Sequence, residues 1–169
     1  MAVKKTDSKE DAPKLIAMVR PRGRAHIRGS IADTLRMLNL TRVNHCSLVF
    51  DKFKFKGMLF KAKDYITWGE VSEKTLARLL KERARVVGDK PLTDDYVKKN
   101  SKLDSVKALA AALMSGKARL NDVKGLKKVF RLSPPKKGYE RKGIKVPYSS
   151  HGVLGYRGDK INDLIERMV

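Results

Sequence analysis

Two kinds of apolar spacing alternate along residues 14–71, and this alternation limits the possible folds more than any other feature of the sequence. Short runs rich in β-branched and aromatic residues are typical of strands, and they lie at 14–20, 43–50 and 65–71. Between these runs, apolar residues recur at helical spacing over about 26–38 and 55–63. The order βαβαβ predicts an α+β fold in which two helices cover one face of a small sheet.

The second of these helices depends on a choice between two periods. Lys and Phe alternate at the start of the segment KFKFKGMLFKAKDY, and strict alternation favours a strand. Phe55, Met58, Leu59 and Ala62 also fall at helical spacing. We prefer a helix over about 55–63.

The residues after this unit predict further helices. Ser72 is a suitable N-cap for a helix that runs to about residue 84, and Ser105 is a suitable N-cap for another that ends before Gly116. A turn-rich link, GDKPLTDDY, separates the two. After a Gly-rich turn, Asp159 is the expected N-cap of a last helix. Its apolar face is expected to consist of Ile161, Leu164, Ile165 and Met168.

The distribution of charge indicates the kind of partner. The 169 residues include 39 Lys and Arg against 18 Asp and Glu, a net charge of +21. Both ends of the chain are neutral, whereas residues 117–145 hold 11 basic and 2 acidic side chains. Solubility alone needs a net charge of only about 2 to 8. The surplus predicts a polyanionic partner, and nucleic acid is the commonest one.

Several classes of protein are excluded by what the sequence does not contain. Cys46 is the only cysteine, so we expect no disulfide and no zinc finger, and we interpret it as a small buried apolar residue. The three histidines are scattered, and no phosphate loop, nucleophile elbow or dinucleotide motif is present. We therefore expect no metal, no cofactor and no catalysis. With no apolar run of membrane-spanning length and no apolar leader, we also expect a protein of the cell interior.

The loop after the first strand, PRGRAHIRG, is the first candidate binding site. It brings four arginines and His26 to the start of a predicted helix, where unpaired N–H groups and the helix dipole favour phosphate. The arginines are Arg20, Arg22, Arg24 and Arg28. Three lysines of the second helix region are expected to extend the same edge: Lys52, Lys54 and Lys56.

The basic segment 117–150 is the second candidate. Pro134 and Pro135 cannot continue a helix and hold the chain extended. The cations that follow are expected to project outward: Lys136, Lys137, Arg141, Lys142 and Lys145. We expect Tyr139 to stack on a base, and residues 131–150 to become ordered only when phosphates reduce the repulsion between like charges. The alternative interpretation is a solvated charged loop.

Five separated motifs occur in an order that resembles one known family. They are the strand–loop–helix of residues 14–40, VNHC at 43–46, YITWGEV at 65–71, RLSPPKKG at 131–138 and the ending GYRGDKINDLI. Together they resemble the long archaeal and eukaryotic form of large-subunit ribosomal protein L-thirty (universal uL-thirty), which is related to eukaryotic ribosomal protein L-seven. The resemblance covers nearly the whole chain.

The resemblance implies a ferredoxin-like βαβαβ core with an antiparallel sheet, and a C-terminal extension, helical and then extended, that bacterial members lack. It also implies binding of large-subunit ribosomal RNA, with contacts to 5S ribosomal RNA and to neighbouring ribosomal proteins. Asn44 and His45 lie in the VNHC motif, and they are either hydrogen bonders at a strand end or RNA contacts. Ser133 departs from the family, which often has His at this place in its Arg-Leu-X-Pro-Pro motif.

These features divide the chain into five predicted segments. They are a flexible leader at 1–13, an RNA-binding βαβαβ core at 14–71, a helical extension packed on it at 72–116, a basic RNA-binding arm at 117–150, and a Gly-rich turn with the C-terminal helix at 151–169.

We predict a structural constituent of the large ribosomal subunit, located in cytoplasmic ribosomes, that binds ribosomal RNA through Arg and Lys contacts to phosphates. It is not expected to be an enzyme. The expected RNA-binding residues are Arg20, Arg22, Arg24, His26, Arg28, Asn44, His45, Lys52, Lys54, Lys56, Arg131, Lys136, Lys137, Tyr139, Arg141, Lys142 and Lys145.

Two other classes of function remain as alternatives. An RNA-processing or modifying enzyme needs a carboxylate cluster beside the basic surface, yet Asp33, Asp51 and Asp64 are isolated in the sequence. A protein that binds anionic membranes needs an amphipathic basic helix with aromatic anchors, and the single tryptophan, Trp68, lies in a predicted strand.

Overall fold

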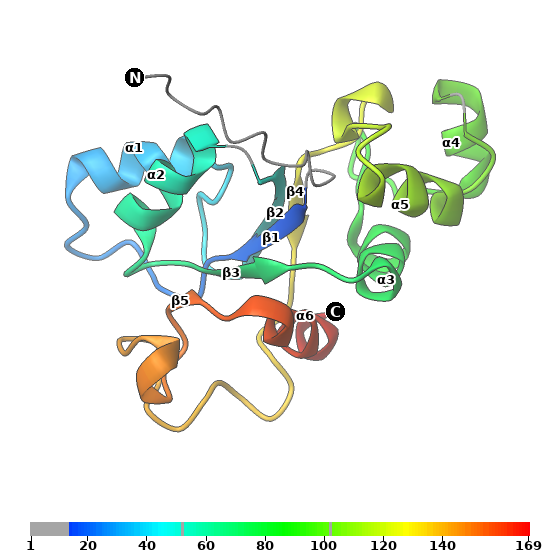
Figure 1. Cartoon of the computed structure of the whole chain (residues 1–169). Helices are drawn as coiled ribbons and strands as arrows, with labels where there is room; N and C mark the ends of the chain where they lie inside the picture. The colour runs from blue at the N-terminus through cyan, green and yellow to red at the C-terminus, as the bar shows by residue number, and fades with distance from the viewer. Residues whose placement is uncertain (1–13, 52, 102) are drawn as a thin grey trace, which may run out of the picture.

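The computed structural model describes residues 14–51, 53–101 and 103–169, and within it a five-stranded sheet forms the centre of the molecule (Figure 1). The strand order is β4-β2-β1-β3-β5. The strands are β1 (Leu15–Val19), β2 (His45–Phe50), β3 (Thr67–Glu70), β4 (Val129–Arg131) and β5 (Gly155–Tyr156). β1 is antiparallel to both β2 and β3, which confirms the predicted antiparallel core. The predicted leader at 1–13 lies outside the described residues.

Two helices, α1 (Gly29–Met37) and α2 (Phe53–Ala62), cover one face of the sheet, as predicted. Ile16 and Met18 of β1 point into this layer, where they pack with Leu35 and Leu59. The segment of α2 forms a helix and not a strand, because its apolar positions meet the sheet at helical spacing.

Three helices that follow the βαβαβ unit cover the second face, so the sheet is buried on both sides (Figure 1). They are α3 (Glu73–Arg83), α5 (Val106–Met114) and α6 (Ile161–Met168). Leu15, Ala17 and Val19 of β1 point into this layer. All five residues of β1 are therefore buried, which explains why its sequence is an uninterrupted apolar run.

Helix starts in the extension follow the capping rules. Ser72 and Ser105 are the N-caps of α3 and α5, and their hydroxyl oxygens accept hydrogen bonds from the N–H groups of Thr75 (3.3 Å) and Ala108 (3.1 Å). The predicted turn-rich link is partly wrong, because Thr93 caps a further helix, α4 (Asp94–Asn100), in the same way. Asp and Thr favour turns as well as helix starts, and here they begin a helix.

Two predicted helix starts are wrong by a few residues. α1 begins at Gly29 rather than near 26, because His26 has a left-handed backbone (φ +52°) that no helix contains. Asp159 does not cap α6; it lies within a 3₁₀ turn, Gly158–Lys160, and the cap residue is Lys160. Two other 3₁₀ turns are Leu120–Asp122 and Tyr148–Ser150.

Cys46 has the structural role that its sequence context predicts. It lies on β2, is fully buried, and packs in the core beneath α3, α5 and α6. Burial raises the pKa of its thiol to about 12, so the unreactive thiol is the dominant form at neutral pH.

Candidate nucleic-acid interface

Loops far apart in the sequence meet at one end of the sheet. β1 ends there and both β2 and β3 begin there, because β1 is antiparallel to its two neighbours. β4 also ends there, since Arg131 pairs with His45, and β5 begins there, since it is parallel to β3. Residues 20–28 and residues 132–154, called the cationic loop below, therefore leave the sheet at the same end, toward the lower left of Figure 1.

Arg20, predicted to meet phosphates, instead holds the backbone of this end together. The residue is only 3% exposed. Its Nε donates to the carbonyl of Arg22 (2.9 Å), its Nη1 to those of Leu40 (2.8 Å) and Thr41 (3.1 Å), and its Nη2 to that of Gly23 (3.0 Å). Because its guanidinium donates hydrogen bonds to four backbone carbonyls, Arg20 has a structural role.

Replacing Arg20 by Lys is expected to lower the free energy of unfolding by about 2 kcal/mol, because an ammonium lacks the planar fork that reaches these carbonyls. Urea unfolding measures the change. Arg24→Lys is the matched control: Arg24 is exposed, and its variant is expected to stay within about 0.5 kcal/mol of wild type. Equal stabilities of the Arg20 and Arg24 variants would assign Arg20 to the surface role.

The other residues of the 20–28 loop differ in how freely they face solvent. Arg22 is half-buried; its guanidinium lies 4.8 Å from the centre of the Tyr65 ring, and its Nη1 donates to the carbonyl of Asp64 (3.2 Å). Arg24, His26 and Arg28 are exposed. These three side chains face solvent, and that of Arg22 does so in part.

Asn44 links three segments at this end of the sheet. Its N–H donates to the carbonyl of Arg20 (2.8 Å), its own carbonyl accepts from Leu132 (3.0 Å), and its Oδ1 accepts from the Tyr139 hydroxyl (3.0 Å). Its left-handed backbone, φ +60°, suits asparagine. Of the two interpretations left open, the structure favours the hydrogen bonder. Tyr139 is half-buried and its hydroxyl is bound to this side chain, while the stacking of its ring on a base stays a prediction.

Arg42 is an exposed cation that is not among the predicted binding residues, and its charge acts on His45. The His45 Nδ1 lies 3.4 Å from both the Thr41 hydroxyl and the Arg42 N–H. Burial lowers the pKa of His45, and the charges of Arg131, Arg42 and Arg20 lower it further. Cations thus converge at this end of the sheet, and Arg42 was detectable as a basic residue directly before the VNHC motif.

The cationic loop presents the predicted arm cations to solvent. Lys136, Lys137, Arg141, Lys142 and Lys145 are all exposed, and none forms an ion pair within the described part of the chain. A hollow of about 800 Å³ lies beside them and is lined in part by Arg141, Lys142 and His151. Arg131 is exposed too, but its Nη1 is paired with Asp89 at 3.0 Å. Ser133, the departure from the family, accepts a hydrogen bond from Arg83 (2.7 Å).

Lys56 does not extend the same edge, contrary to the prediction. It pairs with Asp51 at 3.8 Å, and the Asp51 N–H donates to the carbonyl of Lys14, just before β1. Lys56 therefore lies at the opposite end of the sheet from Arg24 and Arg28. The predicted Lys52 and the side chain of Lys54 lie outside the described residues.

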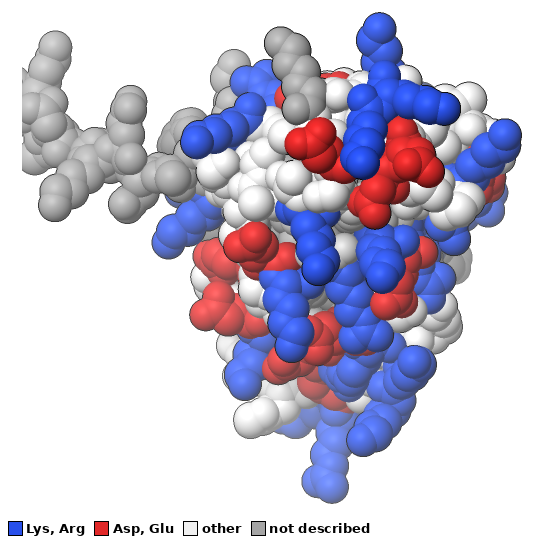
Figure 2. Space-filling model, turned by 90° about the vertical axis from the view of Figure 1, so that its right-hand side faces the viewer, with Lys and Arg blue, Asp and Glu red and all other residues white. Residues whose placement is uncertain are grey.

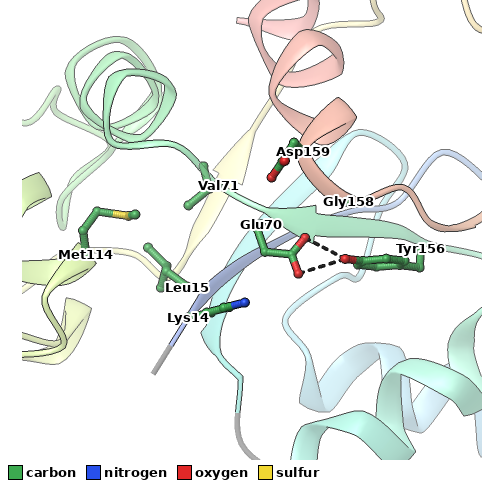
Figure 3. A pocket seen from close by; sticks show the side chains of 8 residues that line it. All are labelled: Lys14, Leu15, Glu70, Val71, Met114, Tyr156, Gly158 and Asp159. Atoms are coloured by element: carbon green, nitrogen blue, oxygen red, sulfur yellow. Dashed lines mark hydrogen bonds between the residues drawn. The ribbon is translucent and has the colours of Figure 1, made fainter. Parts of the chain in front are cut away.

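A cleft of about 490 Å³ has no Ser, Cys or His among the described residues that line it (Figure 3). Its polar lining includes Lys14, Glu70, Tyr156 and Asp159, and the Tyr156 hydroxyl donates to both oxygens of Glu70 (2.9 and 3.0 Å). Among residues 14–51, 53–101 and 103–169, no group of three or more His, Cys, Asp or Glu could hold a metal ion. None of the helices described there is both long and apolar enough to cross a membrane.

The surface around α3, α4 and α5 has a different charge pattern. Figure 2 shows acidic and basic side chains interspersed over this face, with basic side chains projecting at its lower end, the side of the molecule that carries the cationic loop. Acidic side chains repel phosphates, so the sheet end with the cationic loop is the better surface for a polyanion.

The fold and this surface define a class of protein: an α+β sandwich whose sheet is covered by helices on both faces, with a ferredoxin-like core and exposed cations at one end of the sheet. A family model described as "Ribosomal protein L30p/L7e" matches residues 16–66. The "Large ribosomal subunit protein uL30" of Methanosphaera stadtmanae is 52% identical over 155 residues, which cover 92% of this chain and 100% of that protein. The proteins of the same name from Methanopyrus kandleri and Nanoarchaeum equitans are 51% and 50% identical, over 88% and 92% of this chain and 99% of each relative.

The chain belongs to the uL30 family of large ribosomal subunit proteins. The archaeal relatives match both the core and the segments that follow it, which confirms the predicted long, archaeal type. These relatives are ribosomal proteins and not enzymes, in agreement with the prediction from sequence.

Proposed function

We propose that the chain binds large-subunit ribosomal RNA through contacts of Arg and Lys side chains with RNA phosphates, at the end of the sheet where the cationic loop emerges. The observation that carries the proposal is the convergence there of exposed cations from three separate segments: Arg24 and Arg28, Arg42, and the cationic loop. Clustered cations neutralise neighbouring phosphates and release their counterions.

The N-terminus of α1 supports one phosphate contact. The Arg28 carbonyl accepts from the N–H groups of Ile31 (2.9 Å) and Ala32 (3.1 Å), and no side chain in the described part of the chain caps this helix end. A Cβ added at Gly29 would meet no atom of the described residues within 4 Å, so these residues leave the backbone there uncovered. A phosphate at this place receives backbone N–H groups, the helix dipole and the Arg28 guanidinium together.

Titrating labelled large-subunit ribosomal RNA with the protein at increasing KCl tests the proposal. The logarithm of affinity is expected to fall with the logarithm of salt with a slope of about −6, since each of about eight phosphate contacts contributes about 0.7 to 0.9. Arg24→Gln and Arg28→Gln are each expected to make the slope shallower by about one contact and to weaken binding alike for all RNA sequences.

Arg78→Gln is the matched control. Arg78 is an exposed arginine of α3 that pairs with Glu82 at 3.0 Å, away from the sheet end. This variant changes net charge by the same amount and is expected to keep the wild-type slope. A wild-type slope shallower than about −1, or equal effects of all three variants, contradicts the proposal.

The family resemblance extends the proposal to 5S ribosomal RNA and to neighbouring ribosomal proteins as further partners. The same salt titration with 5S RNA in place of the large-subunit RNA tests the first of these.

A further inference from the structure

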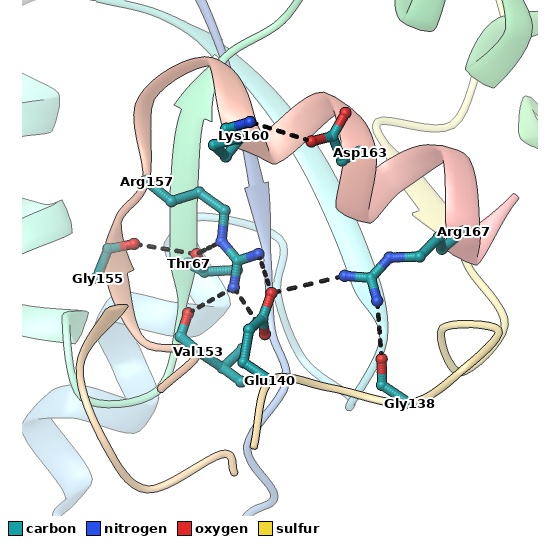
Figure 4. Close-up of polar contacts among 9 residues, drawn as sticks. All are labelled: Thr67, Gly138, Glu140, Val153, Gly155, Arg157, Lys160, Asp163 and Arg167. Atoms are coloured by element: carbon teal, nitrogen blue, oxygen red, sulfur yellow. Dashed lines mark hydrogen bonds and ion pairs between the residues drawn. The ribbon is translucent and has the colours of Figure 1, made fainter. Parts of the chain in front are cut away.

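We propose that the cationic loop holds its conformation before RNA arrives, because an internal latch of Arg157, Glu140 and Arg167 fixes it to the sheet and to α6, and that Glu140 is the positioning residue of the RNA-binding surface (Figure 4). This inference rests on the proposed function for what the loop binds. It replaces the expectation that residues 131–150 become ordered only on binding.

Arg157 is the centre of the latch. Its side chain is 2% exposed, and its Nη1 and Nη2 bind the two oxygens of Glu140 at 2.7 and 3.3 Å. Its Nε donates to the Thr67 hydroxyl on β3 (3.1 Å), and its Nη2 also donates to the carbonyl of Val153 (3.2 Å). The guanidinium lies 4.5 Å from the centre of the Tyr148 ring. One buried side chain therefore joins three points of the cationic loop to the sheet.

Arg167 fixes the same loop to α6. Its Nη2 lies 3.5 Å from Glu140 Oε1, and its Nη1 donates to the carbonyl of Gly138 (3.1 Å). The Arg167 carbonyl accepts from the N–H of Lys136 (2.9 Å), and the Met168 carbonyl accepts from the N–H of Ser133 (3.0 Å). Figure 4 shows Glu140 between the two arginines, with Gly138 beside Arg167.

Two tight turns place the anchored residues inside and the cations outside. Lys137 and Gly138 have left-handed backbones (φ +67° and +75°), and the Gly138 N–H closes a turn on Pro135 (2.9 Å). A second turn closes from the Gly143 N–H to the Glu140 carbonyl (2.8 Å). The exposed cations at 136, 137, 141 and 142 flank the half-buried Tyr139 and Glu140, so fixing Glu140 fixes all four.

The negative charge of Glu140 is directed at the two arginines of the latch. Residues 117–145 contain two acidic side chains, Asp122 and Glu140. Asp122 accepts from the Arg119 N–H (2.7 Å), and Glu140 is enclosed by two arginines. Burial opposes the ionisation of Glu140, but hydrogen bonds and the charges of Arg157 and Arg167 outweigh it and lower its pKa. Glu140 is thus ionised at neutral pH and offsets the repulsion between cations without facing the RNA.

Amide hydrogen exchange of the free protein tests the latch without RNA. In wild type, the amides of 133–143 that donate hydrogen bonds are expected to exchange at least about tenfold more slowly than an unstructured chain. Glu140→Gln is expected to remove most of this protection and to leave that of β1 and β2 intact. Asp163→Asn is the control, because Asp163 is 70% exposed on α6, pairs only with Lys160 (3.9 Å) among described residues, and carries the same charge.

RNA affinity separates positioning from simple electrostatics by the sign of the change. Glu140→Gln adds one net positive charge, so electrostatics alone predicts tighter binding to large-subunit ribosomal RNA. Positioning predicts weaker binding, by about fivefold, with an unchanged salt slope because all cations remain. Asp163→Asn is expected to bind as wild type or slightly more tightly. If Glu140→Gln also speeds amide exchange in β1 and β2, Arg167→Lys is used in its place. The lysine keeps the positive charge and removes the guanidinium that donates to the Gly138 carbonyl.

Each result decides the inference. Rapid exchange of 133–143 in wild type, or unchanged exchange in both Glu140→Gln and Arg167→Lys, overturns the latch. Tighter RNA binding by Glu140→Gln overturns its positioning role. If wild type does not bind this RNA at all, the proposed function fails, whereas the exchange measurement still decides whether the latch exists.

Discussion

Binding to large-subunit ribosomal RNA is expected to weaken at least about a hundredfold at about 0.15 M salt when five cations of the cationic loop are replaced by glutamine. The residues are Lys136, Lys137, Arg141, Lys142 and Lys145, all exposed and all on one loop. Each lost phosphate contact removes a released counterion, so the salt slope should also become shallower, by about 4. Fluorescence anisotropy over a KCl series measures both quantities.

A second set of five lysines makes the matched control: Lys74, Lys81, Lys90, Lys107 and Lys124, which are exposed and lie outside the cationic loop. Replacing them by glutamine changes the net charge equally, and the expected loss of affinity is less than about tenfold. Equal losses for the two sets would show that net charge and not placement controls binding, and would remove the cationic loop from the interface.

Gly69→Ala is expected to destabilise the protein by about 3 kcal/mol or more, the upper range for overpacking. A Cβ at this position of β3 would lie 2.0 Å from the Gly158 carbonyl oxygen and 2.9 Å from its carbon. These are backbone atoms, which cannot turn aside as a side chain does, so β3 and the turn that leads into α6 must separate. Thermal unfolding should show Tm lowered by about 6 to 12 °C.

Gly57→Ala is expected to change the stability of the same protein in the opposite direction. Gly57 lies inside α2, and a Cβ there would meet nothing within 4 Å among the residues that the structure describes. Alanine is the better helix former, so this variant is expected to be more stable by about 0.5 to 1 kcal/mol. If Gly69→Ala unfolds at the wild-type temperature, the close approach of β3 to Gly158 is wrong.

The fold of the core was predictable because its signals are local. The apolar run of β1, the helical spacing of Leu35 and Leu38, and the caps Ser72 and Ser105 each depend on residues within one or two turns. The strands β4 and β5 were missed for the opposite reason. They have three and two residues, and they exist only because β2 and β3 offer unpaired edges.

The candidate site was predictable as a set of cations but not residue by residue. Arg24 and Arg28 lie exposed where the helix pattern placed them, whereas Arg20, in the same Arg-rich run, turns inward to four carbonyls. Composition cannot distinguish them, because the two carbonyls that bind its Nη1 belong to residues 40 and 41. The hydrogen bond of Tyr139 was missed for the same reason, since its partner Asn44 is 95 residues away.

The sequence by itself determined the order of strands and helices in the βαβαβ core, the excess of cations in residues 117–145 and the family, since periodicity, composition and motifs are all properties of neighbours along the chain. The tertiary structure alone decided which cations face outward. Arg157 meets Thr67 across 90 positions and Glu140 across 17, and such pairings depend on how the sheet brings distant segments together. Whether an arginine faces water or a carbonyl depends on its surroundings in three dimensions, which no local pattern specifies.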